Sequence, residues 1–322
     1  MGRPRRTLRG LLGAALCVVS SVGLSTGVRA DEGWAFGPKP PTGGGARDYL
    51  IYELDAGDII QDSVRLSNLG DTPLTFRVYV RDATSASDGI GFSVGRFEDQ
   101  SADAGGWFAL AEGAQEYTVP PQTSADIPFT LSVPAGALPG DHAAGVVAEL
   151  VNPDAGGGGE GNPTVEVVSR IATRSYIRVS GELRPNLAID QLNVSYPNSV
   201  FNTGATVTVT YALSNVGNVR LSPELKLVVK DIFGRTVGEA PLRNFRDVLP
   251  KGTVQLTETF PDVWPVGRLT AEVTAATLGG TPTTTSASAS IWAVPWLLVI
   301  ALGVIVALLI GWRVIARRRK KR

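Results

Sequence analysis

The chain has 322 residues, of which 43% are hydrophobic, and it carries 30 Lys/Arg against 30 Asp/Glu. The balance hides a segregation, because residues 31–290 contain 18 Lys/Arg and all 30 Asp/Glu, a net charge of −12. Such acidity argues against nucleic acid as a partner and against lying on an anionic membrane surface. Cys17 is the only cysteine, so the rest of the chain has no disulfide and no cysteine-based metal site or nucleophile.

The first 30 residues have the pattern of a secretory signal peptide. Four arginines lie within residues 3–9, the apolar run 11–19 follows, and Val28 and Ala30 are the small residues before a cleavage point. The run is too short to span a bilayer, which predicts export and cleavage after Ala30.

Residues 31–46 are rich in Gly and Pro and are predicted to be a flexible lead-in. Trp34 and Phe36 are its only large apolar side chains. They are either tucked onto the first domain or left exposed for a ligand, and we favour tucking.

From Arg47 the hydrophobic pattern alternates with a period of two. Leu74, Phe76, Val78 and Val80, for example, alternate with polar or amphipathic residues, which indicates strands with one face in a core. Short strands separated by Gly, Pro and Asn turns continue to residue 183, with a Gly-rich loop at Asn152–Pro163. This segment is predicted to be the first antiparallel β-sandwich.

A second set of strands follows in residues 185–280, and the two sets resemble each other. The run Leu66–Asp71 (LSNLGD) matches Leu213–Asn218 (LSNVGN), and the order of turns and strands is similar. We therefore predict an all-β protein with two tandem immunoglobulin-like antiparallel sandwiches. The small polar residues 281–290 are predicted to form a stalk.

An apolar run closes the chain. No charged residue lies between Trp292 and Trp312, and seven Lys/Arg occur in residues 313–322. About 20 such residues cover a bilayer core of about 30 Å. Residues 291–312 are therefore predicted to be a transmembrane helix, with residues 313–322 as a cytoplasmic basic tail and the N-terminus outside the cell.

No motif for catalysis is present. His142 is the only histidine; it lacks the other ligands of a zinc site and the partners of a nucleophile, so it is predicted to be an ordinary turn residue. The acidic loops Asp55–Asp62 and Asp82–Asp88 could hold calcium, but solvated turn carboxylates are the preferred interpretation. We expect no cofactor, no metal and no enzymatic activity, although a glycosidase remains an alternative.

One basic stretch stands out in the predicted extracellular part. Arg170, Arg174 and Arg178 recur on a predicted strand. Such charges more often form a solvated face or guard a sheet edge than form a functional patch.

The order of motifs in residues 47–183 resembles the peptidoglycan-binding domain of WxL-interacting proteins, a family of Gram-positive surface proteins. The matching runs are Tyr49–Leu54, Val64–Asn68, Phe76–Tyr79, Asp82–Thr84, Gly89, Trp107, Val133–Pro134, Pro139–Val147 and Arg174–Glu182. The excess of Arg over Lys points to an actinobacterial-type member. The resemblance implies a membrane-anchored surface protein that binds peptidoglycan, while residues beyond Pro185 look only generically immunoglobulin-like.

Sugar binding uses exposed aromatic faces with carboxylate and amide hydrogen bonds. The candidate ligand-binding residues are therefore Trp107, Asp82, Thr84 and Asp88. The alternative for Trp107 is a place in the sandwich core. The alternative function is a protein–protein adhesion or assembly module that contacts other surface proteins through a sheet edge or the 152–163 loop.

Overall fold

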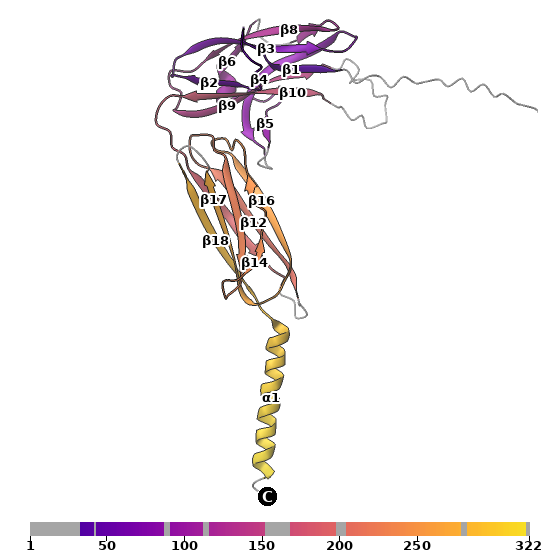
Figure 1. Ribbon diagram of the computed structural model, residues 1–322, viewed down its shortest axis with the longest axis vertical. Coiled ribbons are helices and arrows are strands. Elements are labelled where there is room, and N and C mark those ends of the chain that lie inside the picture. The colour runs from indigo at the N-terminus through magenta and orange to yellow at the C-terminus, as the bar shows by residue number, and fades with distance from the viewer. Residues whose placement is uncertain are drawn as a thin grey trace, which may run out of the picture.

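Figure 1 shows two β-sandwiches, the first lying across one end of the second, and one C-terminal helix at the other end of the second sandwich. This computed structural model describes residues 33–41, 43–86, 91–111, 116–151, 168–197, 204–277 and 282–319. The predicted signal peptide (1–30), the loop 152–163 and Asp88 lie outside the described residues. The predicted fold class is confirmed: two tandem immunoglobulin-like β-sandwiches and one C-terminal apolar helix.

The first sandwich packs a four-stranded sheet against a six-stranded sheet. The four-stranded sheet has the order β1 (Trp34–Pro38), β3 (Ile59–Asn68), β8 (Thr123–Ser132) and β6 (Phe108–Leu110). The other sheet has the order β2 (Leu50–Leu54), β10 (Arg170–Val179), β9 (Gly140–Leu150), β4 (Leu74–Ser85) and β5 (Phe92–Val94), and β7 (Glu116–Val119) also pairs with β4. One 3-10 turn, η1 (Ala104–Trp107), precedes β6.

The alternation predicted for the fourth strand builds the core of this sandwich. Leu74, Phe76, Val78 and Val80 are all buried on β4, because successive side chains of a strand point to opposite faces. They meet apolar side chains from the other sheet in one cluster, which includes Val64, Leu66, Ile127, Phe129 and Leu131. The first core is therefore formed by both sheets together.

One strand pair departs from the antiparallel prediction. β2 lies parallel to β10, with Leu50 opposite Ser175 and Leu54 opposite Val179. A parallel pair needs a long crossover connection, and most of the first sandwich lies between these two strands in sequence. The pairing could not be read from the local pattern, which is the same for either direction.

The second sandwich has sheets of three and five strands. The first has the order β11 (Leu187–Ser195), β12 (Ala205–Asn215) and β16 (Thr253–Val263). The second has the order β14 (Thr236–Glu239), β13 (Pro223–Lys230), β17 (Gly267–Thr277) and β18 (Thr284–Ala293), with β15 (Arg243–Asn244) also on β13. Its core is a separate cluster that includes Tyr211, Leu213, Leu227 and Leu269.

The predicted flexible lead-in is partly wrong. Within residues 31–46, β1 pairs with β3 along its whole length. The ring of Trp34 lies 4.9 Å from that of Phe76 (centroid to centroid), and Trp34 and Phe36 both pack against the first core. The tucked alternative for these two side chains is thus confirmed, and their burial explains why a Gly/Pro-rich segment forms a strand.

The predicted polar stalk at residues 281–290 is also wrong. β18 pairs with β17 over ten residues, from Thr284 opposite Ala276 to Ala293 opposite Gly267. Ser and Thr alternate with small alanines along it, and Ala289 and Ile291 pack against the second core. The strand was missed because its inward side chains are too small to give a strong hydrophobic alternation.

The apolar helix begins later than predicted. α1 (Trp296–Arg319) follows β18 after only Val294 and Pro295, so Ile291 and Trp292 belong to the sandwich rather than to the helix. No residue of α1 is buried against the rest of the chain. The helix is long and apolar enough to cross a membrane.

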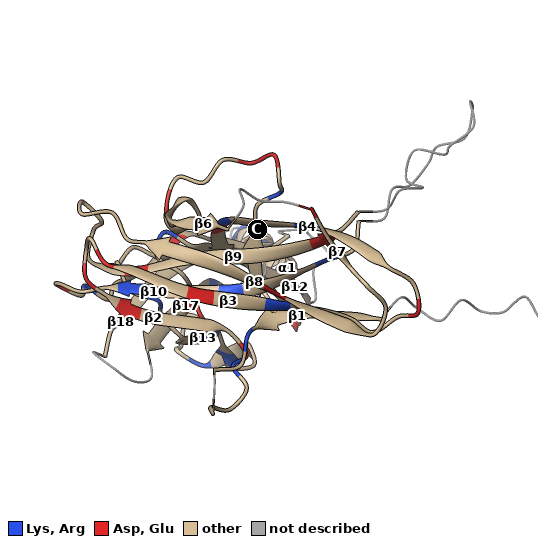
Figure 2. Ribbon diagram, turned by 90° about the horizontal axis from the view of Figure 1, so that it is seen from above, with Lys and Arg blue, Asp and Glu red and all other residues tan. Residues whose placement is uncertain are grey.

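Basic and acidic residues are interspersed along the strands, which Figure 2 views from above with Lys and Arg blue and Asp and Glu red. Several of them form ion pairs across strands, such as Arg65 with Asp126 (2.7 Å) and Arg77 with Glu116 (3.4 Å). Opposite charges placed across neighbouring strands in this way stabilise the sheets.

Candidate functional site

Asp82, on β4, anchors the turn that precedes β6. Its carboxylate accepts hydrogen bonds from the backbone N–H groups of Ala102 (2.6 Å), Asp103 (3.0 Å) and Gly105 (2.7 Å). Gly105 is pressed against β4, where a Cβ atom would lie 2.4 Å from the Asp82 nitrogen. Three of the roughly four acceptor positions of a carboxylate are thus occupied, so Asp82 is mainly a structural anchor.

Trp107 is half-buried and lies against His142 of β9. The two ring centroids are 4.6 Å apart with an interplanar angle of 49°, and Trp107 also packs against the first core. It is therefore neither a fully buried core residue nor a free platform for a sugar ring.

His142 hydrogen-bonds through both ring nitrogens. Nδ1 lies 2.7 Å from Oδ1 of Asp103 and Nε2 lies 2.9 Å from the carbonyl oxygen of Leu138. A carboxylate and a carbonyl only accept, and both ring nitrogens donate only in the imidazolium form. Burial opposes that charge, but the bonds to Asp103 and Leu138 outweigh it and raise the pKa of His142. This is more than the ordinary turn residue that the sequence predicts.

Asp82 and Thr84 line one polar cleft of about 390 Å³ beside β4 and β5. Its other lining side chains include Ser93, Arg96, Gln100 and Arg170. Two of the four predicted site residues therefore meet, whereas Trp107 is not in the lining and Asp88 lies outside the described residues.

The loop on one side of this polar cleft is held by Arg81. Its guanidinium donates to the carbonyl oxygens of Val80, Arg96 and Phe97, and it lies over the rings of Tyr79 and Phe97. Arg81 therefore fixes the backbone around Arg96. The cleft offers hydroxyls, an amide, guanidinium groups and the carboxylates of Asp82 and Asp99 in one place. This set can hydrogen-bond sugars, and its guanidinium groups can pair with carboxylates.

A second cleft, of about 470 Å³, lies where the two sandwiches meet. Asp103, Leu138 and His142 line it from the first sandwich, and Asn218, Leu249 and Lys251 line it from the second. Of the predicted site residues that the structure describes, Trp107, Asp82 and Thr84 are all absent from this lining. The turn anchored by Asp82 nevertheless reaches it through Asp103.

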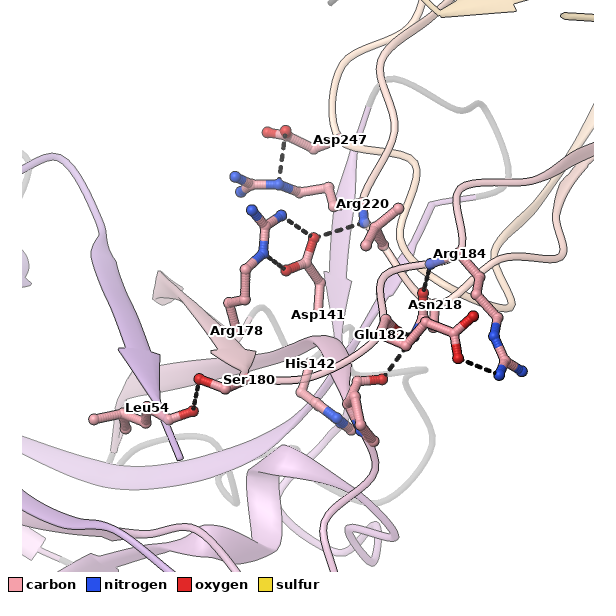
Figure 3. A network of polar contacts seen from close by, with 12 residues as sticks. Leu54, Asp141, His142, Arg178, Ser180, Glu182, Arg184, Asn218, Arg220 and Asp247 are labelled. Atoms are coloured by element: carbon pink, nitrogen blue, oxygen red, sulfur yellow. Dashed lines mark hydrogen bonds and ion pairs between the residues drawn. The ribbon is translucent and has the colours of Figure 1, made fainter. Parts of the chain in front are cut away.

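Asp141 joins the two sandwiches beside this second cleft, as Figure 3 shows. Its carboxylate accepts from Nε and Nη2 of Arg178 at 2.6 and 2.7 Å and from the backbone N–H of Arg220 at 2.7 Å. The Asp141 side chain is only 9% exposed. One largely shielded carboxylate thus holds a strand of its own sheet and the backbone of the other domain, an arrangement that we call the Asp141 clasp.

Asn218 of the second sandwich completes the junction. Its carbonyl oxygen accepts from the backbone N–H of Asp141 (2.7 Å), and its side-chain amide donates to the carbonyls of Pro139 (2.8 Å) and Glu182 (2.9 Å). Its side-chain oxygen accepts from the backbone N–H of Arg184 (2.6 Å). Asn218 therefore bonds both to the start of β9 and to the segment that connects the domains.

Apolar and aromatic contacts support the polar ones. Tyr176 and Leu249, from different sandwiches, are buried in one small cluster. The Arg220 guanidinium lies 4.0 Å from the centre of the Tyr176 ring and 3.5 Å from Oδ1 of Asp247, and the Leu249 N–H donates to Oγ of Ser85 (2.9 Å). Such a packed, mixed interface sets one orientation of the two sandwiches.

The three arginines of the basic stretch, which were predicted to form a solvated face or to guard a sheet edge, have three different surroundings in the structure. Arg178 is part of the Asp141 clasp, Arg174 lies 5.3 Å from the centre of the Phe92 ring, and Arg170 lines the polar cleft. Sequence reasoning missed Asp141 and Asn218. The glycine at position 140 was the one sequence signal of this junction. Its φ is +129°, and a Cβ atom there would lie 2.2 Å from the backbone oxygen of Asn218. Only glycine fits such a close approach.

Among the described residues, no group of three or more His, Cys, Asp or Glu side chains is close enough to hold a metal ion. The acidic loop residue Asp62 instead bonds to Arg47 (2.8 Å) and Tyr52 (2.8 Å). The described carboxylates of the two acidic loops are thus engaged in part by side chains and backbone of the same sandwich.

No protein-family model and no curated protein matches this chain. Distant similarities exist among solved structures. A chaperone–tip adhesin pre-assembly complex from Csu pili of Acinetobacter baumannii is 14% identical, with a TM-score of 0.38 over 81% of this chain and 98% of that chain. The CupB2 chaperone of Pseudomonas aeruginosa is 14% identical, with a TM-score of 0.32 over 74% and 95%. A PapD-like domain of human CEP192 is 8% identical, with a TM-score of 0.30 over 56% and 99%. At these scores the similarities say nothing about function.

Proposed function

We propose that this chain is a non-enzymatic cell-surface protein, anchored in the membrane by α1, whose first sandwich binds peptidoglycan. The polar cleft beside β4 and β5 is the observation that carries the proposal. Thr84 and Ser93 supply hydroxyls there, and Arg96 and Arg170 supply guanidinium groups. Peptidoglycan presents sugar hydroxyls together with the carboxylates of its peptide stems, and guanidinium pairs well with carboxylate.

The arrangement of the domains supports the same function. Figure 1 shows the second sandwich between α1 and the first sandwich, and the Asp141 clasp holds the two sandwiches in one orientation. With α1 in a bilayer, the first sandwich is held away from the membrane, where a cell wall lies. The resemblance of residues 47–183 to the peptidoglycan-binding domain of WxL-interacting proteins agrees with this placement.

Three features support the anchor. The uncharged part of α1, Trp296–Trp312, has 17 residues, within the range of about 17–25 that spans a bilayer. None of its residues is buried, unlike the core helix of a soluble protein. Arg317, Arg318 and Arg319 end it on the side that we assign to the cytoplasm.

Co-sedimentation of the detergent-solubilised chain with protein-free peptidoglycan tests the proposal. We expect saturable pelleting that Arg96→Ala and Arg170→Ala each weaken several-fold, since each removes a carboxylate-binding group from the cleft. Arg65→Ala is the matched control, because Arg65 is an arginine of the opposite sheet whose side chain is 42% exposed. Absence of pelleting, or equal loss with Arg65→Ala, would refute peptidoglycan binding at this cleft.

A second candidate is a protein–protein module that adds a partner strand to a sheet edge. β2 lies at the edge of its sheet, and Ile51 on it is 55% exposed. An exposed edge strand with an apolar side chain is suited to strand addition. If Ile51→Lys abolishes capture of a surface protein while peptidoglycan pelleting is unchanged, this edge is the interaction site.

A further inference from the structure

The membrane-proximal end of the second sandwich carries an exposed apolar surface. Two loops form it: Ile232 and Phe233 follow β13, and Trp264 follows β16. These side chains are 52%, 73% and 65% exposed. Together with Leu297 and Leu298 of α1 they line an apolar hollow of about 400 Å³, which we call the tip hollow.

The first of these loops is built to hold its apolar side chains outward. The Asp231 carboxylate accepts from the backbone N–H groups of Phe233 and Arg235, both at 2.9 Å, and from Nε of Arg235 at 2.7 Å. Asp231 itself is buried, and the guanidinium of Arg235 lies 5.3 Å from the centre of the Phe233 ring. The loop is therefore a fixed turn with Phe233 at its tip.

The short connection between β18 and α1 determines how far this apolar surface lies from the bilayer. Gly267, at the start of β17, lies opposite Ala293, the last residue of β18, so the loop before β17 adjoins the end of β18. Only Val294 and Pro295 separate Ala293 from the helix. Two extended residues span at most about 7 Å. The headgroup layer on each side of a bilayer is about as thick, roughly 5–7 Å.

We propose that Ile232, Phe233 and Trp264 insert into the lipid headgroup layer and dock the second sandwich on the membrane. This inference rests on the proposed anchoring by α1. Aromatic side chains favour the headgroup layer, and apolar faces bind there at the boundary with the acyl chains. Docking at two loops, in addition to the helix, fixes the tilt of the sandwiches relative to the membrane.

Lipid is favoured over a protein as the occupant because the tip hollow is continuous with the membrane-spanning surface. Leu297 and Leu298 line it from the first turn of α1, and these residues face acyl chains when the helix spans a bilayer. A second copy of the chain would have to displace lipid from both the loops and the helix.

Lipid-borne quenchers test this docking. The full chain carries Cys17→Ser and one added cysteine with an environment-sensitive fluorophore, in nanodiscs of phosphatidylcholine and phosphatidylglycerol with a doxyl group high on the acyl chain. Phe233→Cys reports on the tip, and Leu297→Cys reports on helix insertion. Leu242→Cys is the matched control. Leu242 is an exposed apolar residue (52%) of the same sandwich as Phe233, but it adjoins Arg243, which pairs with Leu225. Leu225 lies five residues along β13 from Lys230, or about 17 Å.

We expect quenching and a blue-shifted emission at positions 233 and 297 and neither at position 242. If position 297 is quenched and position 233 is not, the helix inserts but the tip does not dock, and the inference is overturned. If position 233 is shielded from water without lipid quenching, a second copy covers the tip, which also overturns it. If neither position is quenched, the anchoring proposal itself fails.

Discussion

The buried side chains of Asn68 and Asn215 make the same three hydrogen bonds in the two sandwiches. Asn68 donates to the carbonyls of Thr72 (2.8 Å) and Val119 (2.9 Å), and its oxygen accepts from the N–H of Gly70 (2.9 Å). Asn215 donates to the carbonyls of Val219 and Val248, both at 2.8 Å, and accepts from Gly217 (3.0 Å). The repeated sequence LSN-x-G is thus a repeated structure: one buried amide ties a turn to a distant segment of its sandwich.

Replacing either asparagine with alanine is expected to destabilise its sandwich by about 2–4 kcal/mol. The substitution removes the three hydrogen bonds of a buried amide, and each such bond contributes about 0.5–1.5 kcal/mol net. Urea unfolding of the full chain in detergent, followed by fluorescence, measures the loss. Asn244→Ala is the control, since Asn244 is exposed; a similar loss there would contradict the assigned role.

Asp141→Ala is expected to loosen the junction between the sandwiches while each sandwich stays folded. The substitution removes the acceptor for the Arg178 guanidinium and for the Arg220 N–H. Small-angle X-ray scattering should show a broader distribution of interdomain distances, and proteolysis in residues 182–186 should be faster. Unchanged scattering would show that the apolar contact of Tyr176 with Leu249 holds the orientation without the clasp.

Arg220→Ala separates the two kinds of junction contact. The clasp uses only the backbone N–H of Arg220, which alanine retains. The stacking on Tyr176 and the ion pair with Asp247 are lost. We expect a smaller gain in flexibility than for Asp141→Ala in the same scattering measurement. A larger gain would show that the stacking of Arg220 on Tyr176, rather than the Asp141 clasp, mainly fixes the orientation of the sandwiches.

His142 is expected to titrate above the ordinary histidine value of about 6.5, because its bonds to Asp103 and Leu138 outweigh burial and raise its pKa. A raised pKa in the folded state contributes stability below about pH 6.5, which is lost as the pH rises through the folded pKa. The protein has a single histidine, so its ring resonance in an NMR titration reports this pKa directly. Asp103→Asn should lower it; an unchanged titration would exclude Asp103 as a cause.

Substitutions at Asp82 and Thr84 are expected to differ in effect: the first should reduce stability, and the second should reduce binding. Asp82→Ala leaves three backbone N–H groups without their acceptor, so we expect a loss of about 2–4 kcal/mol in urea unfolding. Thr84 is exposed, so Thr84→Ala should change stability by less than about 0.5 kcal/mol and weaken only peptidoglycan pelleting. If Thr84→Ala leaves pelleting unchanged, Thr84 is not part of a binding site.

Local patterns in the sequence were enough for the all-β class, for the two related halves and for an apolar C-terminal helix. The alternation at Leu74, Phe76 and Val78 indicates directly that one face of the strand is buried. The LSN-x-G repeat predicts a turn, because the side chains of Asn68 and Asn215 bond to an N–H two residues further along. These features depend on residues near one another in the chain. Such features can therefore be recognised from the sequence alone.

Only the tertiary structure decided which segments meet. Asp141 bonds to the backbone of Arg220, 79 residues away, and β18 is a strand because β17 offers an edge to its small side chains. Asp82 looked like a free ligand until the folded chain placed three backbone N–H groups around it. A residue's local sequence determines what it can bond to, but the partner depends on how distant strands pack, and that packing is a property of the whole chain.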